Sequence, residues 1–456
     1  MTDDRRPLTD DRFALDARPV APVASRTAGA PDPTPKGGPI RFRPFRAWRP
    51  VPELAARVAA PPYDVVTRAE AAALAKGNPF SFLHVARADI DVPAETDPHD
   101  ARVYATARAN LEMFFGDGTF IHEAAPSIYV YQLSSSLGDQ VGVVGCVHVD
   151  DYAENVILKH ETTRPDKEAD RTHHILTVNA HAEPVLLAHE PSPFLGQLHH
   201  RDMTEAPLYD FTGPDGVRHR LWRVHDPATY VDAFRRIRAA YVADGHHRCA
   251  SALSAARERR AHTARPTGDE EYNWFPAVLF PSSQLHILAY NRAVKDLNGR
   301  SPEDFLAALG GVGIVKPSRE AAPGRSGAFG VLVGGSWYRL ELDPASIRSE
   351  DPVASLDASL LQERVLGPLL GIRDPRTDPR IEFVGGLKGT EELERRVRSG
   401  EAAVGFALNP VNIQQLIAIA DAGAVMPPKS TWFEPKLLSG LFVHPLDGVG
   451  QEGATR

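Results

Sequence analysis

The run from Asp244 to Arg248 gathers groups that bind anions. Short β-favouring residues precede it and an alanine-rich segment follows it, which predicts a strand, a tight turn and a helix. We expect Asp244 to be the N-cap and Gly245 to supply backbone freedom, which places His246, His247 and Arg248 in the first helical turn. Free N–H groups, the helix dipole, two imidazoles and a guanidinium then converge, so the run predicts a phosphate site. Ordinary helix capping is the alternative interpretation.

A second polar run spans residues 159–174. Its His160-Glu161 pair does not begin a zinc protease motif, because H-E-x-x-H requires a histidine where Arg164 stands. The adjacent histidines at 173 and 174 diverge on a strand or a helix, so they do not chelate one metal together.

The same run is better suited to hold a phosphate or carboxylate. Lys159 and Arg171, with Arg164, would supply positive charge, while His160 and Glu161 could shuttle a proton. The alternative is a solvated, charged helix start with a proline at its first position.

Two other stretches carry candidate polar groups. Two prolines fix the backbone ahead of Tyr63 and Asp64; Asp64 is a candidate carboxylate, and Tyr63 fits core packing equally well. Near the C-terminus, residues 429–431 (Lys-Ser-Thr) resemble the end of a P-loop, but G-x-x-x-x-G-K is absent. Lys429 and Lys436 either lie beside the site or cover packing where two domains meet.

Composition limits the function classes. The chain has 456 residues, 43% of them hydrophobic, and a net charge of −8, which argues against nucleic acid as a main partner. It has two cysteines without C-x-x-C spacing, no signal-peptide pattern, and no apolar run of the roughly 18–20 residues that a membrane span needs. We therefore expect a soluble, cytoplasmic protein without a membrane partner.

The pattern along the chain divides it into four parts. We expect a disordered leader at 1–39, a core at 40–298, a C-terminal α+β domain at 299–443 and a tail at 444–456. Within the core, the sequence predicts helices at 67–75, 101–115 and 228–239, hairpins at 127–149 and 211–224, and strands at 80–85, 179–187 and 274–280.

With these segments located, the chain resembles the bacterial and archaeal family known as domain of unknown function 1015. The resemblance covers about residues 40–443 and rests on 45–48, 61–65, 159–162, 170–171, 244–248, 426–431 and 436–437. The Gly-x-His-Arg turn is similar, more remotely, to the nucleotide-binding turn of the ParB and sulfiredoxin superfamily, which includes free-serine kinases with an Asp-Gly-His-x-Arg run. This resemblance implies an α/β fold with a ParB/sulfiredoxin-like mixed-sheet core, and nucleotide phosphates bound at 245–248.

The chain also departs from these patterns. Sulfiredoxins carry a cysteine where His246 stands, so the resemblance does not imply sulfinic acid repair. The family's usual His-Arg after the strand near Tyr290 is Asn291-Arg292 here, which leaves Arg292 as the anion contact.

Together, these observations predict a phosphotransferase that moves a phosphoryl group between a nucleotide, ATP or ADP with Mg²⁺, and a small hydroxylated, serine-like metabolite. The candidate catalytic residues are Asp244, His246, His247, Glu161 and Asp64. The candidate phosphate or nucleotide contacts are Gly245, His247, Arg248, Lys159, His160, Thr162, Arg171, Lys429, Ser430 and Thr431, and Asp244 is also the candidate Mg²⁺ ligand.

Two alternatives stay open. One is a nucleotide-gated binding protein without turnover, and the other is a phosphatase of a small phosphorylated metabolite with His246 or His247 as acid or nucleophile. The phosphotransferase, the binding protein and the phosphatase differ in whether they need a nucleotide and in whether a small acceptor consumes it. The sequence does not predict the oligomeric state.

Overall fold

A mixed nine-stranded sheet forms the larger body of the molecule. The computed structural model describes residues 38–447, so nearly all of the expected leader, and the end of the expected tail, lie outside the described residues. The strand order is β6-β11-β8-β12-β5-β4-β10-β9, and β1 also pairs with β5. β11 pairs with β6 and β12 pairs with β8 in parallel, whereas the other neighbours are antiparallel. The strands are β1 (Phe42–Arg43), β4 (Tyr129–Ser135), β5 (Gly138–His148), β6 (Ile157–Leu158), β8 (Val185–His189), β9 (Tyr209–Thr212), β10 (Arg218–Arg223), β11 (Ala240–Asp244) and β12 (Trp274–Pro281).

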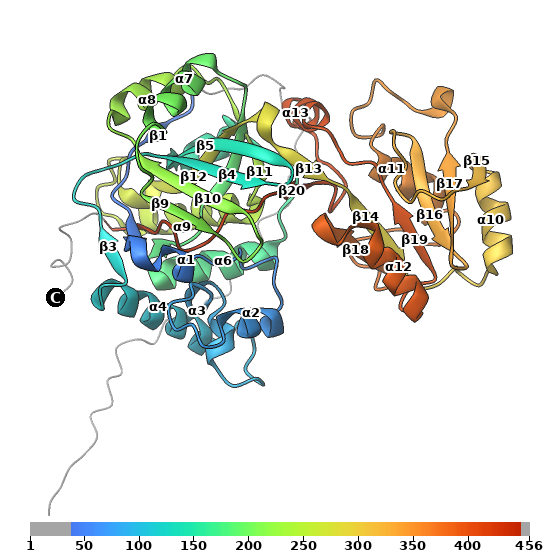
Figure 1. Cartoon of the computed structure of the whole chain (residues 1–456), viewed down its shortest axis with the longest axis horizontal. Coiled ribbons are helices and arrows are strands. Elements are labelled where there is room, and N and C mark those ends of the chain that lie inside the picture. Colours follow the sequence, from blue (N-terminus) through green and yellow to red (C-terminus); the bar gives the residue numbers. More distant parts are fainter. Residues whose placement is uncertain (1–37, 448–456) are drawn as a thin grey trace, which may run out of the picture. The chain divides into compact units, whose positions relative to one another are not determined.

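Helices cover this sheet and bury its apolar side chains. Figure 1 shows α3 (Leu83–Ala86), α4 (Ala101–Gly116) and α6 (Pro165–Val178) on one side, and α7 (Pro193–Asp202) and α8 (Pro227–Phe234) at the opposite end. α9 (His246–His262) packs along α6 and also against α5 (Val149–Ala153). The strands β5 and β12 are buried along most of their length, because both faces of the sheet carry packed layers.

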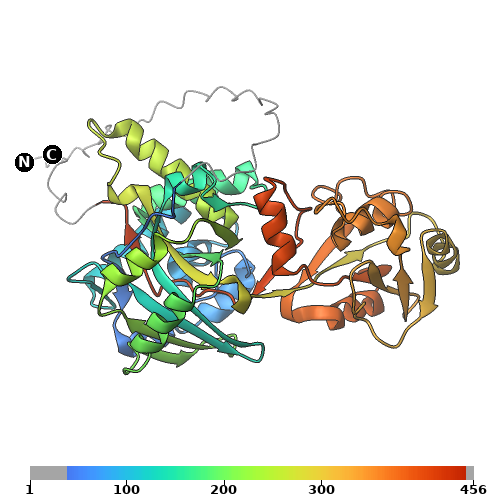
Figure 2. The same ribbon diagram turned by 90° about the horizontal axis from the view of Figure 1, so that it is seen from above.

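A second sheet has six antiparallel strands in the order β15-β17-β16-β19-β14-β18. Its strands are β14 (Tyr290–Val294), β15 (Ile314–Pro317), β16 (Ala328–Val333), β17 (Ser336–Glu341), β18 (Ile381–Gly385) and β19 (Val404–Ala407). It is accompanied by α10 (Pro302–Gly310), α11 (Asp357–Leu361) and α12 (Gly389–Ser399), and Figure 2 shows this body in yellow to red.

After the second sheet the chain returns to the first body. β20 (Trp432–Glu434) pairs with β13 (His286–Leu288), and β21 (His444–Pro445) pairs with β7 (Ala180–His181). Hydrophobic side chains of α13 (Ile413–Asp421) and of the segment after it share a core with β4, β5 and β12. The domain boundaries at 298 and 443 stay predictions, but this packing favours an earlier return to the first body.

The α/β class and the mixed sheet predicted from the sequence are confirmed. Both hairpins form, as β4–β5 and β9–β10, and α2 (Arg68–Ala75) begins with the expected capping box of Thr67 and Glu70. Within the described chain, no helix is long and apolar enough to cross a membrane.

Two predicted strands are wrong. Residues 80–85 form a turn that leads into α3, because a short apolar run fits a buried helix as well as a buried strand. The predicted strand at 179–187 is split into β7 and β8 around Pro184, whose missing N–H cannot join the ladder.

The core of the first body contains histidines that burial keeps neutral, which predicts a pH dependence of stability. On α7, burial lowers the pKa of His199 from 6.5 to about 4. Between these values the unfolded chain binds a proton that the folded chain does not, so stability falls as the pH drops. We expect His199→Leu to reduce the slope of unfolding free energy against pH by about 1.4 kcal/mol per pH unit between pH 6 and 4.5, measured by urea denaturation.

The neighbouring exposed residue His200 provides the control on the same helix. His200→Leu should leave the slope at its wild-type value. Equal slopes for His199→Leu and the wild type would contradict the prediction.

Candidate functional site

The turn between β11 and α9 is the centre of the candidate site. Gly245, and not Asp244 as predicted, is the N-cap of α9, with φ at 105° and no side-chain cap. Asp244 ends β11, and its carboxylate is occupied elsewhere: Oδ2 accepts a hydrogen bond from Arg248 Nη2 at 2.7 Å, and Oδ1 lies 3.4 Å from Lys436 Nζ. Because no side chain caps α9 in the described chain, its first N–H groups are available to an anion.

Arg248 is buried beneath this turn and holds Asp244 in place. Its side chain is 8% exposed, and Nη1 donates to the carbonyl of Pro184. Burial disfavours its charged form, but Asp244 and other nearby acids outweigh that effect and raise its pKa. For Asp244 the balance is similar: burial alone would raise its pKa, but Lys436 and Arg248 together lower it. Asp244 is therefore a weak base.

The segment after β6 brings Glu161 to α9. The His160 N–H donates to His246 Nε2 at 3.5 Å, and the two rings meet edge to face at 4.4 Å. Because Nε2 accepts, neutral His246 carries its proton on Nδ1, which lies 3.8 Å from Glu161 Oε2. Burial is the main cause that raises the pKa of Glu161, and Lys429 opposes it. Burial also lowers the pKa of His246 well below its usual value, so the ring stays neutral.

His247 is held by the same segment. Its Nε2 accepts the backbone N–H of Arg164 at 3.1 Å, so Nδ1 carries the proton of the neutral ring. Burial lowers the pKa of His247, and Asp64 opposes that shift. His247 therefore offers a neutral N–H donor beside the helix terminus.

The segment at 427–436 supplies two lysines. Lys429 is exposed, and its carbonyl accepts from Arg292 Nη2 at 3.0 Å. Neighbouring protein atoms partly desolvate its ammonium group, which alone would lower the pKa of Lys429, but Tyr290 and the carboxylates of Glu161 and Asp64 raise it. Lys436 lies 4.5 Å from the centre of the Trp432 ring, in addition to its contact with Asp244. Lys436 thus contacts Asp244 directly, and Lys429 acts electrostatically on Glu161 and His247.

The polar side chains next to Lys429 bind other parts of the protein. Ser430 Oγ donates to the carbonyl of Pro427 at 2.7 Å, which occupies its proton within the loop. Thr431 Oγ1 lies 3.3 Å from His160 Nε2, so this loop contacts the segment that carries Glu161. Arg292 binds backbone carbonyls, which is a different role from the anion contact expected for it.

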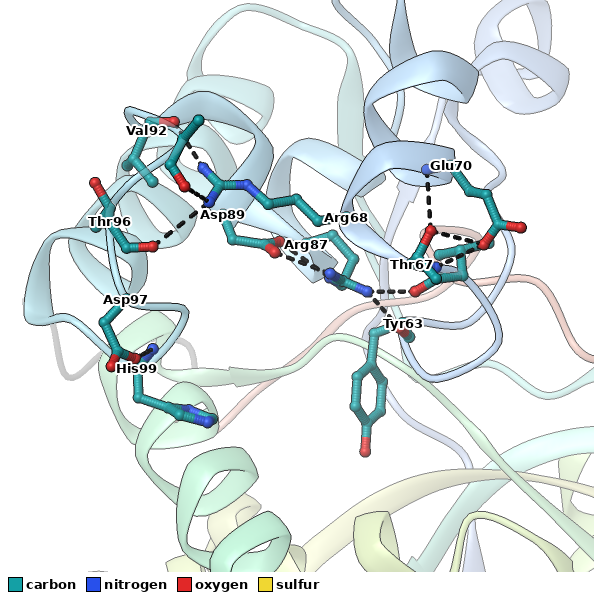
Figure 3. Close-up of polar contacts among 12 residues, drawn as sticks. Tyr63, Thr67, Arg68, Glu70, Arg87, Asp89, Val92, Thr96, Asp97 and His99 are labelled. Atoms are coloured by element: carbon teal, nitrogen blue, oxygen red, sulfur yellow. Dashed lines mark hydrogen bonds and ion pairs between the residues drawn. The ribbon is translucent and has the colours of Figure 1, made fainter. Parts of the chain in front are cut away.

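The turn with Asp64 is fixed from behind by Arg87. Figure 3 shows the Arg87 guanidinium bound to Asp89 and to the carbonyl of Tyr63, while the Tyr63 ring points away from it. Arg87 also donates to the carbonyl of Val66. The exposed Asp64 carboxylate affects the pKa values of Glu161, His247 and Lys429. Asp64 thus belongs to the electrostatic surroundings of the site.

Not every predicted contact lies at the turn. Lys159 Nζ lies 4.2 Å from the centre of the Tyr152 ring, and burial lowers its pKa. Arg171 Nε binds Asp170 at 2.9 Å, and its guanidinium stacks 4.3 Å from the Tyr63 ring. Thr162 is exposed and has no hydrogen bond to the turn within residues 38–447. Their roles as phosphate contacts stay predictions.

Asp244 does not fit the predicted Mg²⁺ site, since two cations already bind its carboxylate. Among the residues that the structure describes, no three His, Cys, Asp or Glu side chains are grouped to hold a metal ion. We derive no step through a protein-bound metal.

The close packing of Gly245 gives a testable prediction. A Cβ at this position would lie 3.0 Å from Arg248 Nε and 3.1 Å from Val185 Cγ1, and φ is left-handed. We expect Gly245→Ala to lower the free energy of unfolding by about 2–3 kcal/mol, of which about 1–2 kcal/mol is backbone strain. Gly216→Ala is the control in urea denaturation, because its φ is 78° but no atom lies within 4 Å of the added Cβ. Equal losses for the two variants would show that the contacts contribute nothing.

A family model described as "Protein of unknown function (DUF1015)" matches residues 42–359, which confirms the resemblance found in the sequence. Curated proteins give no match. Among solved structures, a conserved hypothetical protein from Pyrococcus furiosus is similar at 15% identity and a TM-score of 0.33, with 66% of this chain and 94% of that chain covered.

Two other solved structures are similar to the same degree. A free serine kinase variant in complex with AMP has 13% identity and a TM-score of 0.34, with 64% of this chain and 86% of that one covered. SbnI with a C-terminal truncation, from Staphylococcus aureus, has 14% identity and a TM-score of 0.35, with coverage of 66% and 87%.

Proposed function

The chain belongs to the DUF1015 family, whose function is not described, and from that premise we propose that it transfers a phosphoryl group between a nucleotide and a small hydroxylated metabolite. The observation that carries the proposal is the uncapped N-terminus of α9 next to the carboxylate of Glu161. Phosphoryl transfer needs these two elements: donors that stabilise the phosphate charge, and a base that accepts the hydroxyl proton.

The first-turn N–H groups of α9 hold the phosphates in this proposal. His247 Nδ1–H and the ammonium group of Lys429 add a neutral donor and a charge, and Lys436 neutralises Asp244 so that the anion is not repelled. When bound, the nucleotide supplies the phosphoryl group. Arg248 acts through Asp244 and the turn, since its guanidinium is buried below them.

Glu161 is the proposed base. A raised pKa makes a carboxylate a stronger base, and His246 Nδ1 lies 3.8 Å from one of the Glu161 oxygens. Asp244 is a poorer candidate, because the cations that bind it lower its pKa. The acceptor is proposed to be serine or a serine-like amino acid, on the motif resemblance of residues 244–248 to free-serine kinases.

A thermal-shift panel tests the proposal. We expect ATP or ADP, in a buffer that contains Mg²⁺, to raise the melting temperature of the wild type because a ligand that binds the folded state stabilises it. In a second step, ³¹P NMR should detect nucleotide consumption only when serine is present.

Two other outcomes would contradict the proposal and would each identify a different function. A nucleotide-dependent rise without turnover for serine or other hydroxylated amino acids would identify a binding protein. No rise with any nucleotide, together with a rise and phosphate release with phosphoserine alone, would identify a phosphatase.

A further inference from the structure

A small cavity lies behind the turn, on the inner side of Arg248. Its volume is about 30 Å³, and its lining includes the side chains of Arg171, Glu183 and Arg248 together with the apolar Val185 and Phe275. A cavity needs roughly 10–15 Å³ of such volume to hold one water molecule. Its contents are therefore limited to one or two water molecules or a single monatomic ion.

The cavity brings together buried donors that have no acceptor. In the described chain, Arg171 Nη1 and Arg248 Nε are buried without a hydrogen-bond partner. Arg248 is more than nine-tenths buried, so solvent does not satisfy its Nε–H. A buried donor without a partner destabilises the fold, and an occupant of the cavity that accepts hydrogen bonds would relieve that cost.

Charge decides what that occupant is. The bonds of the two guanidiniums to Asp170 and Asp244 use other nitrogen atoms than the unpartnered ones. The remaining carboxylate in the lining is Glu183, whose Oε1 accepts from the Tyr63 N–H at 3.2 Å and from Ser439 Oγ at 2.7 Å. Neither guanidinium lies within ion-pair distance, 4.0 Å, of Glu183 among the described ion pairs. Burial raises the pKa of Glu183, and the guanidiniums of Arg248 and Arg171 oppose that shift.

We propose that this cavity is a binding site for a single halide ion, with chloride as the physiological ligand, held between Arg171 Nη1 and Arg248 Nε. The unpartnered N–H groups of two guanidiniums suit a weakly hydrated monatomic anion, and the small volume disfavours larger anions such as phosphate. The existence of this site does not depend on the proposed function.

Crystals of the full chain grown or soaked in sodium bromide test the site directly. We expect an anomalous bromide peak inside the cavity, within hydrogen-bond distance of both guanidiniums. Peaks confined to the surface, or density in the cavity without anomalous signal at saturating bromide, would overturn the proposal in favour of adventitious ions or ordered water.

A solution measurement checks the same point without crystals. At constant ionic strength, exchanging gluconate for chloride should raise the wild-type melting temperature by about 2–4 °C, and bromide should act likewise. Arg171→Gln should abolish the difference between chloride and gluconate, whereas Arg257→Gln, at an exposed position on α9, should retain it. No difference between the salts for the wild type would overturn the proposal even if Arg171→Gln fails to fold.

Discussion

Glu161→Gln is expected to reduce phosphoryl transfer by about 10²–10⁴-fold while the nucleotide-induced rise in melting temperature persists. Glutamine keeps the shape of the side chain and can still face the Nδ1–H of His246, but it cannot accept the proton of the attacking hydroxyl. In the wild type the rate should fall as the pH drops through the raised pKa of Glu161, because only the ionised carboxylate is a base. Initial rates with serine and ATP measure both effects.

Glu154→Gln is the matched control, because the Glu154 side chain is 58% exposed and lies before β6, whereas Glu161 follows that strand. Its rate should equal that of the wild type. A Glu161→Gln enzyme with unchanged turnover would remove Glu161 from the mechanism and leave Asp64 as the next carboxylate to replace.

Arg248→Ala is expected to lower the free energy of unfolding by about 3 kcal/mol, near the lower end of the range for breaking a buried ion pair. The loss stays at that end because Asp244 keeps Lys436 as a partner. The carbonyl of Pro184 also loses its donor. Since Arg248 positions the turn, the nucleotide-induced thermal shift should disappear with it.

Urea denaturation compares this variant with Arg257→Ala, an exposed arginine on the same helix, which should change stability by less than about 0.5 kcal/mol. Similar losses for the two variants would show that the Asp244–Arg248 pair contributes little. A stable Arg248→Ala protein that keeps its nucleotide shift would remove Arg248 from the site.

The sequence predicted the local elements of the site because their signals are local. Strand, glycine turn and helix at 240–262 follow from hydrophobic pattern and glycine placement, and the left-handed φ of Gly245 agrees with its residue type. The position of the N-cap was wrong by one residue. No residue near Asp244 in the sequence indicates that its carboxylate contacts Lys436, which is 192 positions away.

The absence of long-range contacts from the sequence pattern also explains the other differences between the predictions and the structure. Sequence pattern cannot predict which partner a charged side chain finds across the fold, so it did not separate Lys159, which covers Tyr152, from Lys429, which stays near Glu161. The role of Arg87 behind the Asp64 turn also depends on a distant backbone conformation and has no motif. Short apolar runs such as 80–85 are ambiguous until their packing partners are known.

The return of the chain to its first body sets the order in which the site is completed during synthesis. A nascent chain that has emerged only to residue 359, where the family match ends, already contains β11, α9 and Glu161. It lacks both lysines, β20 and β21, so Asp244 has Arg248 alone and one edge of the core is uncovered. The segment from Lys429 to β21 thus acts as a completion step, because the site acquires the charges of both lysines only after that segment has been made.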